Sequence, residues 1–133
     1  TPTSTLTLAA SNTLSGSVVV NGGTLAIGAS GSLGPNCTNI IVTAGTLSVQ
    51  NSAGAALADT ATIYMSGSGS AKIAVTNGVT ETVRFLIVDG KYKRAGTYGS
   101  SDSPAANRDS TLFSGMGVLN VRSDISGTSI LVR

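Results

Sequence analysis

Six acidic and eight basic side chains carry the charge of this 133-residue chain, and histidine is absent. The absence of histidine excludes histidine general bases, the usual hydrolase triads and most zinc sites. Three of the remaining candidates stand close together in the polar segment GSSDSPAANRDS, namely Asp102, Arg108 and Asp109. Two carboxylates and a guanidinium in one loop are groups that contact sugars, so we retain them as a candidate glycan contact. Their plainer interpretation is that they solvate the loop.

Two further sets of residues could carry chemistry. Lys91, Lys93 and Arg94 form the one basic cluster, which is typical of an edge strand that charge protects from pairing, with a polyanion-binding stripe as the alternative. The cluster is too short for a nucleic-acid patch, and we expect no nucleic-acid partner. A single cysteine, Cys37, excludes an intramolecular disulfide, and we expect a small buried residue rather than a reactive thiol.

The composition favours short strands and tight turns. Hydrophobic residues make up 41% of the chain and glycine occurs 17 times, but there are only two Phe, three Tyr and no Trp. No charged side chain precedes Asp59. No stretch approaches the roughly 18 apolar residues of a membrane helix, so we expect no membrane span.

A repeat of about 22 residues organises the first half of the chain. The phrases GGTLAI and AGTLSV align Leu25 with Leu47, an offset of 22 residues, and a weaker copy, GSAKIAV, follows. A second series of apolar pairs runs just ahead of each copy, as in Val18 and Val20. Each unit therefore contains two short strands of period two, with a glycine-bearing corner between them.

A repeat of this length that cannot bury its own apolar face predicts a stack of successive copies. We therefore expect an all-β fold, a right-handed parallel β-helix (β-solenoid) of roughly five or six rungs, forming a single domain over residues 1–133. Residues 1–80 would form the repeat rungs around a narrow aliphatic core without large aromatics. Residues 81–133 would form a divergent hairpin with an Asp89-Gly90 turn, a polar loop and terminal strands. An antiparallel β-sandwich is the alternative.

The outer positions of the repeats are Ser, Thr, Ala and Asn. β-Helix enzymes that cleave acidic polysaccharides need clustered carboxylates on that outer face, and the repeats provide none. We therefore expect no catalytic residue, no bound metal and no cofactor, and we do not expect an enzyme.

The units GGTLAI and AGTLSV resemble the autotransporter-associated β-strand repeat of bacterial surface and secreted proteins. The segment FLIVDGKYKRAGTYGSSDSPAANRDSTLFSGMGVLNV, residues 85–121, resembles the stretch that closes many such repeat regions. The resemblance spans residues 13–121 and implies an exported bacterial β-helix, extracellular or at the cell surface. Family members are usually much longer, which leaves open whether this chain is a fragment, a processed product or a stand-alone subunit.

The two ends of a solenoid carry unpaired backbone groups, which monomeric proteins blunt with caps, charge or proline. The uncharged N-terminal end has only Pro2, and the C-terminal end carries a strand-like segment. We therefore expect a self-assembling structural protein whose copies join head to tail by strand addition. The expected interface residues are Leu6, Leu8, Val18, Val20, Ile130, Leu131 and Val132. The alternatives are an adhesin or spacer module of a larger surface protein and a binder of cell-surface or matrix glycans.

Overall fold

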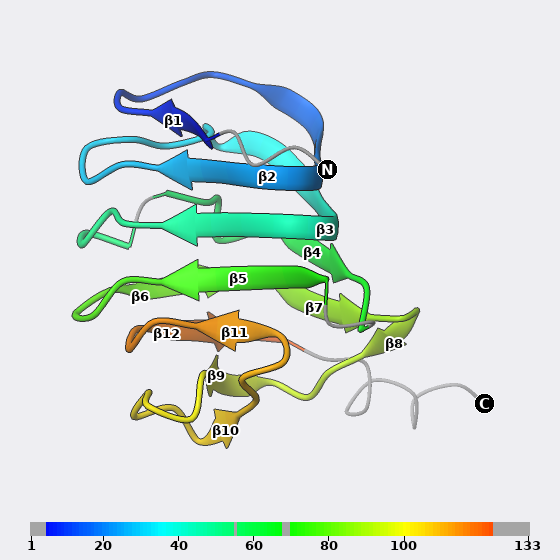
Figure 1. Ribbon diagram of the computed structural model, residues 1–133. Coiled ribbons are helices and arrows are strands. Elements are labelled where there is room, and N and C mark those ends of the chain that lie inside the picture. The colour runs from blue at the N-terminus through cyan, green and yellow to red at the C-terminus, as the bar shows by residue number, and fades with distance from the viewer. Residues whose placement is uncertain (1–4, 55, 68–69, 124–133) are drawn as a thin grey trace.

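A computed structural model describes residues 5–54, 56–67 and 70–123 (Figure 1). The fold is an all-β, right-handed parallel solenoid of about four turns, and no helix occurs in the described residues. Strands of successive turns pair in parallel, from β1 (Thr5–Leu8) through β2 (Ser15–Ile27) to β3 (Asn36–Val49) and beyond. The predicted fold class is therefore confirmed, and the β-sandwich alternative is wrong.

The coil has three faces. The first face contains residues 15–20 of β2 and 36–42 of β3, followed by β4 (Thr62–Met65) and β7 (Phe85–Val88). The second face, at the front of Figure 1, contains β1, the later parts of β2 and β3, β5 (Ala71–Val75) and β11 (Phe113–Ser114). The third face consists of corner loops in the upper turns, and of β6 (Thr80–Val83) with β12 (Val118–Val121) below them.

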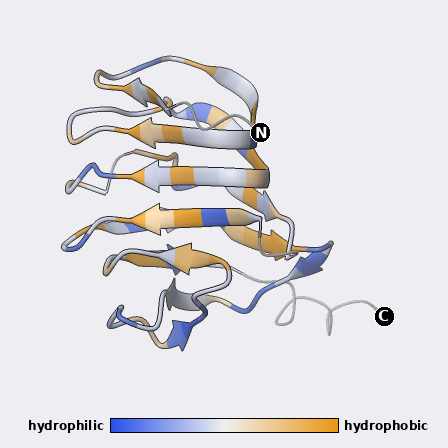
Figure 2. Cartoon of the chain, viewed as in Figure 1, coloured by the Kyte–Doolittle hydropathy of each residue, from blue (hydrophilic) through white to orange (hydrophobic). Residues whose placement is uncertain are grey.

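The register follows the repeat in the sequence. Leu25 lies beside Leu47, which in turn lies beside Ile73, so the aligned copies occupy equivalent positions in adjacent turns. Ile40 lies beside Ile63 in the same way on the first face. These side chains point into the coil, and on the second face they alternate with outward polar or small residues, as the bands of colour along the front strands in Figure 2 show.

The number of turns is smaller than the predicted five or six, because about twenty residues leave the coil. β8 (Lys91–Tyr92) turns back antiparallel on β7, and β9 (Gly96–Gly99) pairs antiparallel with β12 and in parallel with β10 (Asn107–Arg108). The chain re-enters the second face only at β11. The hairpin is as predicted, with Asp89 and Gly90 both at positive φ, 52° and 80°.

The core consists mainly of stacked aliphatic side chains, as expected, but its last turn also contains aromatics. Phe113 is fully buried beneath the second face, and its ring lies 6.1 Å from that of the buried Tyr98. The prediction that large aromatics would not fit is therefore wrong at this end. One of the two rings, that of Tyr98, belongs to β9, which lies in the segment outside the repeat.

The corner between the first and second faces depends on close backbone contact between turns. Gly45 has a φ of 80°, and a Cβ at this position would lie 2.5 Å from the carbonyl oxygen of Gly23 in the turn before. A side chain there would push two turns apart, so the spacing of the coil requires glycine.

We predict that Gly45→Ala destabilises the fold more than Gly78→Ala. Gly78 has a similar φ of 88°, but a Cβ there has no atom within 4 Å, so its substitution carries only backbone strain of about 1–2 kcal/mol. Gly45→Ala adds the clash with the preceding turn. Urea denaturation of the two variants measures the difference, and equal losses of unfolding free energy would contradict the close-contact explanation.

Candidate functional site

The N-terminal end of the solenoid has an incomplete turn. β1 pairs with residues 24–27 of β2, so it covers the second face only. Residues 15–20, on the first face, pair with β3 on one side, and no described residue pairs with them on the other side. One strand edge therefore presents its backbone N–H and C=O groups at this end, which is the geometry that accepts an added strand.

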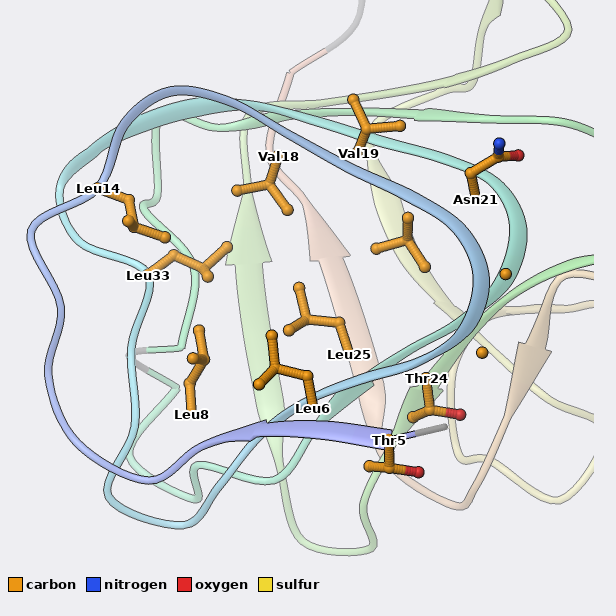
Figure 3. A pocket seen from close by; sticks show the side chains of 13 residues that line it. Thr5, Leu6, Leu8, Leu14, Val18, Val19, Asn21, Thr24, Leu25 and Leu33 are labelled. Carbon is orange, nitrogen blue, oxygen red and sulfur yellow. The ribbon is translucent and has the colours of Figure 1, made fainter. Parts of the chain in front are cut away.

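This end also exposes the apolar interior of the coil. A hollow of about 540 Å³ opens between β1 and the first face of β2, and Figure 3 shows Leu6, Leu8, Leu14, Val18 and Leu25 pointing into it. No charged side chain lines the hollow. Its full lining comprises Thr5, Leu6, Leu8, Leu14, Val18, Val19, Val20, Asn21, Gly22, Gly23, Thr24, Leu25 and Leu33.

These side chains are exposed because no described residue covers the first face at this end. Leu6 is 63% exposed and Leu14 is 42% exposed, whereas Leu47, which points into the same core one turn below Leu25, is 0% exposed. Val19 points away from the coil and is 59% exposed, as Figure 3 also shows. Large contiguous apolar surface of this kind marks an interaction site in a folded protein.

The structure places four of the seven predicted interface residues together. Leu6, Leu8, Val18 and Val20 all line the hollow, with Val20 already buried by the turn below. The other three, residues 130–132, lie outside the described residues. Leu14, Val19 and Leu25 were missed by the prediction, although the period-two alternation that identified Val18 also applies to Leu25.

The opposite end of the solenoid is charged. A second hollow, of about 400 Å³, is lined by Tyr92, Lys93, Arg94, Tyr98, Asn107, Arg108, Asp109, Leu112 and Phe113. Three of these side chains are cationic and one is anionic. The hydroxyl of Tyr98 donates to the backbone oxygen of Arg94 at 2.7 Å, which fixes the segment between β8 and β9 over the floor of the hollow.

The predicted glycan contact is only partly assembled. Arg108 and Asp109 line the second hollow, but Asp102 does not. The backbone N–H of Asp102 donates to Ser100 Oγ at 3.2 Å within its own turn. The carboxylate of Asp109 accepts the N–H of Thr111 at 2.8 Å, so part of its role is to hold the local turn.

Of the basic cluster, Lys91 belongs to the edge strand β8, whereas Lys93 and Arg94 follow it and line the second hollow. β8 ends the path of the larger sheet and pairs only with β7 among the described strands. Tyr92 packs its ring edge-on against Phe85, with centroids 5.3 Å apart, which anchors this short strand. Charge at this edge disfavours addition of a further strand.

Glu81 is a buried carboxylate that the analysis of the sequence missed. It is 0% exposed, and its two oxygens accept the backbone N–H groups of Ala56 and Leu57 at 3.1 and 3.2 Å. Burial raises its pKa from 4.5 to about 7; the two hydrogen bonds oppose that rise and the charge of Asp59 adds to it. The sequence does indicate its burial, because Val79, Glu81 and Val83 occupy alternate positions along the chain and all three are buried. Both of its oxygens are used to fasten a corner loop to β6, which makes its role structural.

The remaining candidates give no sign of a reactive centre. Cys37 is a free thiol that is fully buried, and burial raises its pKa, in agreement with the prediction. Within residues 5–54, 56–67 and 70–123, no three His, Cys, Asp or Glu side chains gather closely enough to hold a metal ion. No described residue belongs to a helix that is long and apolar enough to cross a membrane.

Comparison of the chain with protein-family models, curated proteins and solved structures found no match.

We predict a specific pH dependence of stability from Glu81. Its folded pKa of about 7 exceeds the ordinary 4.5, so its contribution is fully present below pH 4.5 and is lost as pH rises to about 7. The loss amounts to at most about 3 kcal/mol. Glu81→Gln removes this titration, so the difference in unfolding free energy between the two proteins should fall between pH 4.5 and 7. Urea denaturation at a series of pH values measures it, and a difference that stays constant over this window would disprove the assignment.

Proposed function

We propose that this chain is a non-enzymatic extracellular structural protein, a self-assembling subunit of a filament or surface scaffold. Copies join head to tail by β-strand addition at the N-terminal end of the solenoid. The observation that carries the proposal is the incomplete first turn, where an unpaired strand edge borders an uncharged apolar hollow of about 540 Å³. A strand added there satisfies the backbone groups and covers the exposed leucines.

The difference between the two ends supports a polymer over a closed dimer. The N-terminal end is apolar and without charge, whereas the other end carries the cations of the second hollow and the edge strand β8. Two apolar N-terminal ends that met each other would give a symmetric dimer, whereas a segment from the opposite end of a second copy makes the contact heterologous. A heterologous contact that does not close into a ring continues as a filament.

The proposed location outside the bacterial cell rests on the resemblance to the autotransporter-associated repeat, which remains a prediction. The proposed lack of enzymatic activity is supported by the absence of histidine from the chain and by the structural use of Glu81. The solenoid is compatible with both parts of the proposal, since such coils serve as rigid scaffolds.

We predict that deleting residues 126–133 abolishes assembly. This deletion removes the apolar segment that the proposal assigns to strand addition and leaves the described strands in place. Negative-stain electron microscopy and sedimentation velocity should show filaments for the full chain and monomers for the deletion. Circular dichroism checks that the shortened chain still folds. A full chain that stays monomeric at high concentration would refute the proposed function, as would filaments that persist after the deletion.

A second candidate, glycan binding, is favoured by one observation. The second hollow combines the cations Lys93, Arg94 and Arg108 with the partly exposed ring of Tyr92. Cations and an aromatic edge in a surface hollow suit a saccharide that carries carboxylate or sulfate groups.

We predict for this candidate that Arg108→Ala reduces binding of acidic polysaccharides about tenfold, because it removes a charge that lines the hollow. Asp102→Asn, outside the hollow, is the matched control in the same loop and should leave binding unchanged. A glycan array followed by titration calorimetry provides the measurement. Absence of binding to any acidic glycan, or equal binding by both variants, would remove this candidate.

A further inference from the structure

The first face is built from one repeated triplet of apolar residues. Its members lie in register through four successive turns, with the first and third side chains toward the coil and the middle one away from it; in the last turn the middle residue, Ile87, is only 5% exposed, where β8 pairs with β7. The inward side chains Ile40 and Ile63 are 0% exposed, whereas the middle residues Val19 and Tyr64 are 59% and 39% exposed. The four triplets are residues 18–20 (VVV), 40–42 (IIV), 63–65 (IYM) and 86–88 (LIV).

Among the described residues, none occupies the position above residues 15–20 on the first face, and one further triplet would continue the column at this vacant position. The second face begins with β1, but the first face begins one turn later with β2. The strand edge of residues 15–20 and the uncovered Val18 and Leu14 lie beneath the position where a preceding triplet would run. Every strand of this column that pairs across turns does so in parallel, so an occupant that continues the column is parallel as well.

A fifth copy of the triplet is present in the sequence, outside the described residues. Residues 130–132 read ILV and follow Ser129, as VVV follows Ser17. The last described residue, Ser123, donates its N–H to the carbonyl of Arg84 at 3.0 Å. Arg84 stands directly before β7, so the described chain ends at the corner where the first face begins, and residues 124–133 follow in the sequence.

We propose that residues 130–132 of a second copy occupy the vacant position as a parallel strand, with Ile130 beside Val18, Leu131 beside Val19 and Val132 beside Val20. This inference rests on the proposed function and specifies its joint. In this register two side chains enter the hollow and Leu131 lies outside. A shift by one residue would place a single side chain inside and expose two, because neighbouring residues of a strand face opposite sides.

The length of the link favours a second copy over the chain's own tail. Ser123 lies one strand spacing below Arg84, so the position above β2 lies five strand spacings away, roughly 24 Å at about 4.8 Å each. The seven Cα–Cα steps from Ser123 to Ile130 span at most about 25 Å when fully extended. The chain's own tail would therefore have to run straight along the outside of the coil, whereas the tail of a copy stacked on this end starts close to the vacant position.

Paired cysteines test the register in the full-length chain. Val19→Cys with Leu131→Cys places two outward thiols on neighbouring strands about 4.8 Å apart, within the range of a disulfide. Ser17→Cys with Leu131→Cys is the matched control, offset by two residues and about 8 Å apart, beyond that range. Cys37 is common to both variants and is buried. Mild oxidation should give a ladder of covalent oligomers on a non-reducing gel for the first pair and none for the control.

The other outcomes test two claims separately, namely the register of residues 130–132 and their origin in a second copy. Filaments without a ladder from the first pair, or with a ladder only from the control pair, would overturn the register while leaving the proposed function in place. A cross-linked monomer without a ladder would show that the chain's own tail is the occupant and would overturn the second copy. If the unmodified chain forms no filaments at all, the proposed function itself fails.

Single substitutions in the triplet provide a measurement that does not depend on disulfide formation. Ile130→Asp puts a charge into the apolar hollow and should raise the critical concentration for assembly at least about tenfold. Leu131→Asp, at the outward position, should change it by less than about threefold. The reverse order of effects would show the slipped register and overturn the proposed one.

Discussion

Parallel pairing between successive turns is the interaction on which this structure depends. A single turn of about 22 residues has one apolar side per strand and too little chain to cover it, so each turn is stable only with a neighbour above and below. Leu47 is buried because Leu25 and Ile73 lie on either side of it. The same contact fixes the corners, since Gly45 must lie against the backbone of the previous turn. At each end of the stack of described turns, the last turn has no neighbour to cover its apolar side chains and its backbone groups.

The two ends respond differently to that requirement. At the C-terminal end the chain turns back at Asp89 and Gly90, places β8 along β7, and fills the last turn with Phe113 and Tyr98. At the N-terminal end the described residues, from Thr5 onward, provide only half a turn, and Leu6 and Leu14 are exposed. The candidate site thus lies where the stacking of described turns stops, and its lining consists mainly of the same aliphatic side chains as the core.

Local periodicity made much of the fold predictable from the sequence. The offset between Leu25 and Leu47 gave the register, and Asp89-Gly90 gave the hairpin, because each feature depends on residues close together or repeated. The number of turns was overestimated because the excursion through β9 and β10 depends on pairing with β12, more than ten residues away. Asp102 was grouped with Arg108 by proximity in sequence, but of the two only Arg108 lines the second hollow. The burial of Glu81 could have been read from its inward position between Val79 and Val83, but its partners are backbone groups of a distant loop, which no side-chain pattern reveals.

The neutrality of the hollow at the N-terminal end determines how any contact made there responds to its surroundings. None of its lining side chains carries charge, so attraction at this surface comes from the release of water and from backbone hydrogen bonds. Such attraction is almost insensitive to ionic strength, unlike contacts between charged surfaces. It weakens on cooling, because the apolar contribution fades at low temperature, and sulfate or other excluded salts strengthen it. A fibre held together in this way would tolerate brackish and fresh water alike, and cold would loosen its joints before salt did.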